Sequence, residues 1–271
     1  MLAIGQVSKD LYAYRELLLA LTYRDIRVKY KQAVMGVAWV FFMPLLAIGS
    51  GILFRVAMAV VRGQALELTD VSAVMVKVVP WLMFAAIVGG ASNSLIANMN
   101  LITKIYFPRE VVPLAGVLSA LFDFTISALG LTAVLALMAW TGGPVVVSWN
   151  LLWIPLILMV LVVMAVGMGL ILSAANLFFR DVKYIVQVLL QFGIFFSLVY
   201  ISYDELGRFG WVMLFNPVAP LLEAIRVIVV KGGVDAQIQP FLAYSVLTAG
   251  MSLVVGSMVF RKADHLFAEY V

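Results

Sequence analysis

Side chains that carry covalent chemistry are scarce in this sequence. Its 271 residues include no cysteine and a single histidine, His265. Thiolate nucleophiles are therefore excluded, and a zinc site of the usual His/Cys kind would lack ligands. The glycine-rich phosphate-binding loop and the G-x-S-x-G and H-E-x-x-H motifs are also missing. We predict a protein that is not an enzyme, with no catalytic residues, no metal and no cofactor of its own.

A first charged segment, residues 11–31, has the pattern of an amphipathic helix. Apolar side chains recur in it at helical spacing, and Arg24, Arg27 and Lys31 recur three and four residues apart on a neighbouring face. This pattern is typical of a helix that lies in the membrane interface with its basic side toward headgroups or a protein partner. A simple positively charged membrane anchor is the alternative.

A second charged segment, residues 98–113, places adjacent aromatic side chains between charges. Phe107 is expected to be exposed, and Pro108 is expected to stiffen the turn. Exposed aromatic rings beside arginine and glutamate suit docking onto another protein. The predicted docking residues are Lys104, Tyr106, Phe107, Pro108, Arg109 and Glu110.

One acidic residue, Asp123, lies inside a long apolar stretch. A carboxylate at membrane depth is by default a candidate functional group. No basic residue is expected at a similar depth, so a proton relay is disfavoured. We predict a structural hydrogen bond to a neighbour such as Asn93.

Aromatic side chains gather in the stretch that follows residue 194. Such rings can stack on sugars along a conduit, or they can form an interfacial belt. Composition alone favours the belt. The candidates for a substrate path are Phe195, Phe196, Tyr200, Tyr203 and Trp211.

The composition places these groups in a membrane protein. Hydrophobic residues make up 65% of the chain and charged residues 12%, whereas soluble domains are usually about half apolar and a quarter charged. We predict an all-α integral membrane fold, because a spanning helix needs roughly 20 mostly apolar residues and six such stretches occur. They are residues 33–59, 78–101, 111–140, 151–175, 184–201 and 240–260.

The segment before the last span, about residues 204–239, contains two apolar stretches that are too short to cross a bilayer. The two stretches are residues 209–215 and 218–230, and they are separated by Asn216 and Pro217 and by Pro220. Short broken helices are best interpreted as a re-entrant or interfacial hairpin buried against protein. The alternative, an irregular seventh span, would place Glu223 and Arg226 within the membrane.

Basic residues predict the orientation. With the N-terminus inside, 12 of the 18 lysines and arginines lie on the cytoplasmic side, as the positive-inside rule requires. Both termini are therefore predicted to be cytoplasmic, with an interface helix in residues 1–32, a six-helix domain in residues 33–271 and a cytoplasmic tail in residues 261–271. The basic residues flank apolar runs rather than forming one patch, so nucleic acid is not an expected partner.

Five ordered motifs together resemble a known family. They are the run Tyr23-Arg24-Asp25-Ile26-Arg27-Val28-Lys29-Tyr30-Lys31 continuing to Trp39 and Pro44-Leu45, and the segments 104–113, 176–184, 215–226 and 260–269. Their order is similar to that of type-2 ABC exporter permeases, and within them to the branch that exports O-antigen, teichoic acid and related glycans. The resemblance covers essentially the whole chain. One departure is Leu198, where the family often has a proline, so a kink at that position does not follow from the resemblance.

The resemblance implies a permease in the cytoplasmic (inner) membrane that exports a lipid-linked polysaccharide. Two copies, as a homodimer, would work with two separate ABC ATPase subunits, and ATP and magnesium would bind to those partners. The ATPase would contact Arg24, Asp25, Arg27 and Lys31 together with the 104–110 loop, and residues 211–226, including Asn216, Pro217, Pro220, Glu223 and Arg226, would form an external gate.

Three other functions are weighed against this one. Within the same family, the cargo can be a small molecule or another lipid. A membrane-embedded glycosyl- or acyltransferase would need a cluster of acidic or histidine residues at one membrane face, and the sequence offers none. A channel that works without ATP is disfavoured by the elaborate charged segments expected on the cytoplasmic side.

Overall fold

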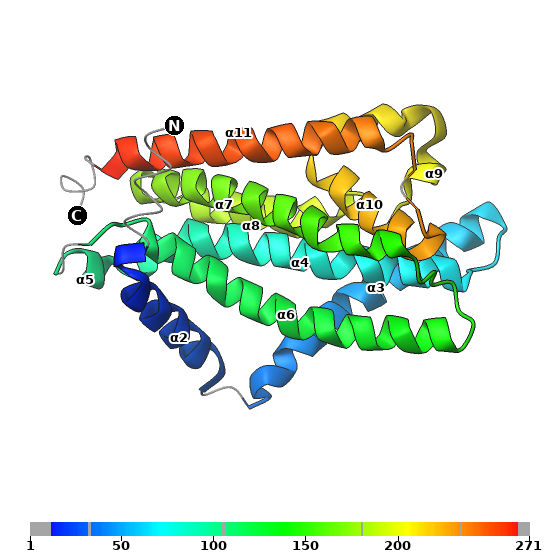
Figure 1. Cartoon of the computed structure of the whole chain (residues 1–271), viewed down its shortest axis with the longest axis horizontal. Coiled ribbons are helices and arrows are strands. Elements are labelled where there is room, and N and C mark those ends of the chain that lie inside the picture. Colours follow the sequence, from blue (N-terminus) through cyan, green and yellow to red (C-terminus); the bar gives the residue numbers. More distant parts are fainter. Residues whose placement is uncertain (1–11, 32–33, 105–106, 180, 234, 265–271) are drawn as a thin grey trace.

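The computed structural model describes residues 12–31, 34–104, 107–179, 181–233 and 235–264, which form helices and connecting turns without a strand among them. The long helices run side by side along the longest axis of the molecule (Figure 1). Helix α2 (Arg15–Lys31) begins and helix α11 (Gln239–Asp264) ends at one end of this bundle, whereas helix α10 (Val218–Lys231) lies near the other. We call these the α2 end and the α10 end.

Within the described residues, five helices are long and apolar enough to cross a membrane. They are α3 (Trp39–Arg62) with the short helix η1 (Gly36–Ala38) before it, α4 (Leu68–Ala97), α6 (Val111–Trp140), α7 (Ile154–Phe178) with η2 (Trp149–Trp153) before it, and α11. The predicted span 184–201 is instead the 15-residue helix α8 (Val182–Phe196). This helix is shorter than the roughly 20 residues of a usual span.

The prediction was least accurate at the second span. Helix α4 begins at Leu68, ten residues before the predicted start at residue 78, so Asp70 and Lys77 lie within the helix rather than in a loop. Its first turn is stabilised by a capping box, in which the side chains of Glu67 and Asp70 each accept a hydrogen bond from the other's backbone. The start of α4 was missed because its polar capping residues, Glu67 and Asp70, have the composition of a loop.

The segment before α11 contains short helices, as predicted. Helix α9 (Tyr203–Leu206) leads into η3 (Gly207–Phe215), and α10 follows after Asn216 and Pro217. Pro220 does not separate two helices, because it lies in the first turn of α10, where the missing proline N–H is not needed. The residues from Val218 to Val229 are all buried, so α10 packs inside the bundle.

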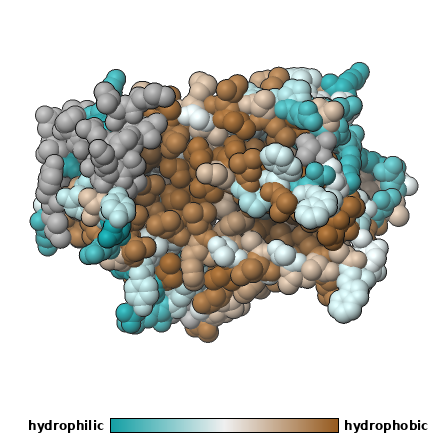
Figure 2. Space-filling view, in the orientation of Figure 1, coloured by the Kyte–Doolittle hydropathy of each residue, from teal (hydrophilic) through white to brown (hydrophobic). Residues whose placement is uncertain are grey.

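Helix α4 lies at the centre of the molecule. It packs against α3, α6, α7, α8 and α10, and its side chains Phe84 and Ile87 join Leu161 of α7 and Leu222 of α10 in the main hydrophobic core. Helix α6, by contrast, has no fully buried residue in its most apolar stretch. A hydrophobic band therefore covers the middle of the molecule and hydrophilic side chains gather at its ends (Figure 2), as expected of a protein surrounded by lipid.

Helices α7 and α11 approach each other through glycine. A Cβ atom added to Gly167 of α7 would lie 2.3 Å from the carbonyl carbon of Ser252, and one added to Gly256 of α11 would lie 2.3 Å from the carbonyl oxygen of Gly167. Small residues at such crossings let two membrane helices pack backbone against backbone. The position of α11 thus depends on these two glycines.

We predict that Gly167→Val lowers the stability of the protein by about 1–3 kcal/mol or more, because its side chain meets backbone that cannot yield. The measurement is the thermal unfolding midpoint in detergent. Gly250→Val in α11 is the matched control, since no atom lies within 4 Å of a Cβ added there. Equal midpoints for the two variants would show that the crossing is not tight.

Candidate functional site

At the α2 end, helix α2 presents the basic residues that the sequence singled out. Arg27 and Lys31 are exposed. Arg24 is tied down, because its guanidinium donates hydrogen bonds to Asp25 at 2.7 Å and to the side-chain oxygen of Asn98 at 2.6 Å. Arg24 and Asp25 therefore attach α2 to the C-terminal end of α4, while Arg27 and Lys31 are free to meet another molecule.

The loop between α5 (Met99–Ile102) and α6 differs from its prediction. Phe107 is buried rather than exposed, and packs in a cluster with Leu21, Leu95 and Phe260. Glu110 forms an ion pair with Arg261 of α11 at 3.3 Å. These contacts come from three helices distant in the sequence, which is why local pattern could not reveal them.

The remaining residues of this loop differ in their exposure. Lys104 is exposed, Pro108 and Arg109 are half-buried, and Tyr106 lies outside the described residues. The loop is thus anchored in the bundle by Phe107 and Glu110. Among the predicted docking residues that the structure describes in this loop, Lys104 is exposed to a partner.

The predicted partner of Asp123 was wrong. Its carboxylate in α6 accepts hydrogen bonds from the ammonium of Lys29 and the hydroxyl of Tyr30, both in α2. Asn93 instead accepts a hydrogen bond from Asn176 at 3.3 Å. Burial, and then the hydrogen bond to Asp123, raise the pKa of Tyr30 above its ordinary value, so this hydroxyl stays protonated. Asp123 therefore holds the C-terminal half of α2 against α6.

At the α10 end, the completely buried Lys77 of α4 joins three segments. Its ammonium donates hydrogen bonds to the carbonyl oxygens of Leu198 and Ile201, each at 2.7 Å, and to Glu223 of α10 at 3.2 Å. Leu198 has a φ of 53°, a left-handed conformation that is rare for a residue with a branched side chain. The chain thus breaks after α8 without a proline, and Lys77 binds the carbonyl groups that the break leaves without helical partners.

Glu223 and Arg226, two of the predicted gate residues, extend this network. Arg226 donates a hydrogen bond to Glu223 at 2.8 Å, and Glu223 also accepts one from the backbone of Tyr203 at 2.8 Å. Arg226 continues to Asp204 at 2.9 Å. Burial alone would raise the pKa of Asp204, but hydrogen bonds from Lys231 and Arg226 hold that pKa below its ordinary value. The carboxylate is therefore ionised at neutral pH, and its pairs weaken only when the pH falls through this lowered pKa.

Asn216 and Pro217 precede the same helix. The side chain of Asn216 accepts a hydrogen bond from the backbone of Val218 at 3.0 Å and donates one to the hydroxyl of Ser197 at 2.8 Å. The carbonyl of Pro217 accepts a hydrogen bond from Ser245 of α11 at 2.7 Å. These contacts connect the start of α10 to the break after α8 and to the last span.

A second ion network connects α3 and α4 to α9. The buried Arg55 of α3 pairs with Glu205, and lies 3.4 Å from Asp70 of α4. Arg62 pairs with the same glutamate at 2.8 Å. Residues of both networks, including Arg55, Glu205 and Arg226, line a polar pocket of about 680 Å³. Lys77, Arg55 and Glu205 were not among the predicted site residues, although charges inside apolar helices were a signal that the sequence did carry.

The predicted aromatic path is not one continuous wall. Phe195, half exposed, lies with its ring centroid 5.4 Å from that of Tyr200. Tyr200 is buried and its hydroxyl lies 3.0 Å from that of Ser50, whereas Phe196 is exposed. Tyr203 packs on Phe241 and Trp211 on Phe215, in clusters separate from the first.

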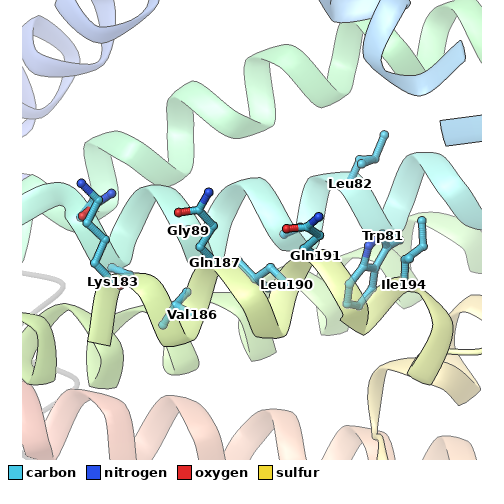
Figure 3. A pocket seen from close by; sticks show the side chains of 12 residues that line it. Trp81, Leu82, Gly89, Lys183, Val186, Gln187, Leu190, Gln191 and Ile194 are labelled. Carbon is cyan, nitrogen blue, oxygen red and sulfur yellow. The ribbon is translucent and has the colours of Figure 1, made fainter. Parts of the chain in front are cut away.

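A groove between α4 and α8 was not predicted. It has a volume of about 470 Å³. Lys183, Gln187 and Gln191 of α8 lie along it in a row, with Trp81 of α4 near its far end (Figure 3). Polar side chains four residues apart in an apolar stretch were visible in the sequence. Only the structure shows that α4 faces them.

The sequence is similar to those of known membrane transport proteins. The family model of the ABC-2 type transporter matches residues 16–230. The chain belongs to this family. The matched part of this ABC-2 transporter runs from α2 to α10 and so includes both ion networks and the groove.

Individual proteins are similar over nearly the full length. An O-antigen export system permease protein RfbA of Klebsiella pneumoniae is 28% identical over 256 residues, which is 94% of each chain. An RfbA of Myxococcus xanthus is 27% identical over 271 residues, covering 98% of this ABC-2 transporter and 99% of the relative. These two proteins carry the name of a transport permease, which agrees with a membrane-embedded bundle.

We predict that Asp123→Leu releases α2 from α6, because it removes the acceptor for both Lys29 and Tyr30. Amide hydrogen exchange in α2 should become faster, while exchange in α4 stays unchanged. Thr125→Val is the control, since the Thr125 hydroxyl bonds only to the carbonyl of Leu121 in its own helix. Unchanged exchange in α2 of the leucine variant would contradict this role.

We predict that Lys77→Met destabilises the protein by about 3–5 kcal/mol, because it removes one of the two cationic partners of the buried Glu223 and leaves two carbonyl groups unpaired. Lys231→Met, which removes an exposed partner of Asp204, should cost about 1 kcal/mol or less. The measurement is thermal unfolding in detergent. Similar losses for the two variants would be evidence against a special role for Lys77.

Proposed function

We propose that this chain is the permease subunit of an ABC exporter that moves a lipid-linked, O-antigen-like polysaccharide across the cytoplasmic membrane. A separate ABC ATPase subunit supplies the energy and binds the ATP and magnesium. The observation that carries the proposal is the similarity to O-antigen export permeases over nearly the whole of both chains. Such coverage is what a shared cargo class and assembly would produce.

In the proposed topology, α8 is the sixth span and both termini are cytoplasmic. The 15 residues of α8 rise about 22 Å, and the non-helical residues 197–202 extend this path toward the roughly 30 Å of a bilayer core. Lys77 supports such a span, because it supplies hydrogen bonds to backbone that no longer bonds to itself. The α2 end is then cytoplasmic and the α10 end is external, with α9, η3 and α10 as the gate hairpin.

In the proposed assembly, two copies of the chain form a homodimer with two ATPase subunits. Arg27, Lys31 and Lys104 form the docking surface for the ATPase, since they are exposed and, unlike Arg24, are not bonded to another side chain in the described part of the chain. Arg24 and Asp25 act indirectly, by holding α2 to α4. Phe107 and Glu110 act in the same way, by fastening the loop to the bundle.

Helix α4 is the element that connects the two ends. Near its inner end, Asn98 accepts a hydrogen bond from Arg24, and further along it Lys77 holds the break after α8 and helix α10. The 21 residues between Lys77 and Asn98 span about 30 Å of helix. A push on α2 by the closing ATPase can therefore reach the external gate through α4, a single helix that contains Pro80.

The proposal is tested by reconstituting the chain in vesicles with its ATPase and with lipid-linked glycan extracted from the producing cells. Glycan should appear on the far side only when ATP is present and both subunits are included. Transport at full rate without the ATPase would contradict the proposal. Transport of small amphiphiles with no transport of glycan would favour the small-molecule alternative.

We predict that Arg27→Glu combined with Lys104→Glu lowers ATP-driven export by about tenfold or more, because like charges would replace the attraction at the docking surface. Co-purification of the ATPase should fall in parallel. Lys262→Glu, a charge reversal at an exposed position of α11 outside both the docking surface and the gate hairpin, is the control and should leave export unchanged. Normal export by the double variant would exclude this surface from coupling.

A further inference from the structure

The polar row on α8 is unusual for a helix in a bilayer. Lys183, Gln187 and Gln191 are four residues apart, so their side chains lie on one side of the helix and successive ones are separated by about 6 Å along it. Figure 3 shows the three side chains pointing to the same side of α8, into the groove. The rest of α8 is apolar, with large exposed side chains such as Leu189 and Phe192.

The amide groups of this row have no partners in the described part of the chain. Neither Gln187 nor Gln191 makes a hydrogen bond there, and both are exposed. A primary amide facing hydrocarbon without a partner costs several kcal/mol. This side of α8 therefore does not face lipid tails.

The opposite wall of the groove, on α4, also carries polar side chains. Asn93 lines the groove, and the buried hydroxyl of the adjacent Ser92 has no hydrogen-bond partner among the described residues. Apolar side chains, such as Leu82 of α4 and Leu190 of α8, complete the lining. The polar row of α8 and Asn93 thus border a lane that a hydroxyl-rich molecule with apolar faces can occupy.

Trp81 defines the far end of the lane. Its indole packs so closely on α8 that a Cβ added to Gly193 would lie 2.7 Å from the ring. The rings of Phe195, Tyr200 and Phe54 gather just beyond this glycine. A polar stretch thus leads into an aromatic one, a sequence of surfaces that suits sugars, whose edges carry hydroxyl groups and whose faces are apolar.

We propose that Gln187 and Gln191 are sugar-binding positions in the transport lane, each amide forming hydrogen bonds with the hydroxyl groups of one sugar residue in transit. This inference rests on the proposed function and assigns its substrate contacts. A primary amide can donate two hydrogen bonds and accept two, which matches pairs of neighbouring hydroxyl groups. The spacing of one helical turn is comparable to the length of one sugar ring, so an extended glycan can occupy both positions at once.

Water access is tested first, with single cysteines, since the natural chain has none. Gln187→Cys and Gln191→Cys are compared with Leu189→Cys, which lies two residues on and so about 200° around the helix. In vesicles containing the permease with its ATPase, a membrane-impermeant thiol reagent should label positions 187 and 191 about tenfold faster than position 189, because only a hydrated thiol ionises and reacts. Equal rates, or labelling of neither glutamine position, would place the row against lipid or against a second copy of the chain and overturn the proposal.

Sugar binding is tested by protection and by export. Lipid-linked glycan from the producing cells should slow the labelling of position 191. In the Gln187→Leu background, the glycan concentration that gives half protection should rise about fivefold, the equivalent of one lost hydrogen bond. Export by Gln187→Leu/Gln191→Leu should fall, while ATPase co-purification is retained and Gln187→Asn/Gln191→Asn, which keeps the amides, retains most of the export.

The outcomes separate this inference from the proposed function. If the natural complex exports glycan and the double leucine variant exports it equally fast with unchanged protection, the sugar-binding positions are wrong and the permease assignment stands. If the natural complex exports no glycan, the proposed function fails and the sugar assignment fails with it, even where positions 187 and 191 label from water.

Discussion

The ammonium group of Lys77 is buried beside hydrogen-bond acceptors that have few other partners. It binds the carbonyl groups of Leu198 and Ile201, which the end of α8 leaves without helical partners, and it balances the carboxylate of Glu223. In a bilayer no water can take over these bonds, so irregular backbone is stable only where the protein satisfies it. The break after α8 and the placement of α10 both depend on this one side chain.

The same rule explains why the α10 end is built from ion pairs. Arg55 connects α3 to Asp70 and Glu205, and Arg226 connects α10 to Asp204. Buried pairs of this kind add little net stability over apolar packing, because desolvation offsets the attraction. Their contribution is specificity, since each charge accepts only a neighbour of opposite sign. In the proposed transporter, such a defined resting arrangement would suit a gate that opens and closes again.

At the α2 end, some charged and aromatic side chains hold the helices together, and others remain exposed to a partner. Arg24, Lys29 and Phe107 are used within the chain, on Asn98, on Asp123 and in a hydrophobic cluster. Arg27, Lys31 and Lys104 remain exposed. In the proposed assembly, forces applied by the ATPase to the exposed residues would act on a helix already fixed to α4 and α6, and α4 would carry them to Lys77. The groove between α4 and α8 lies along the same helix, so in this proposal a movement of α4 would change the lane and the gate together.

The amino-acid sequence alone determined the all-helical membrane character, most of the long apolar helices, the amphipathic α2 and the short helices around Asn216 and Pro217, because these depend on local composition and periodicity. The order of its motifs also indicated the family to which the chain belongs. Tertiary structure alone decided that Asp123 pairs with Lys29, that Phe107 is buried, that α8 ends at Phe196 and that the glutamines of α8 face α4. Each of these contacts joins segments far apart in the chain, such as the 146 positions between Lys77 and Glu223. No local pattern encodes which distant helix will lie alongside, since that choice is made by the packing of all the helices at once.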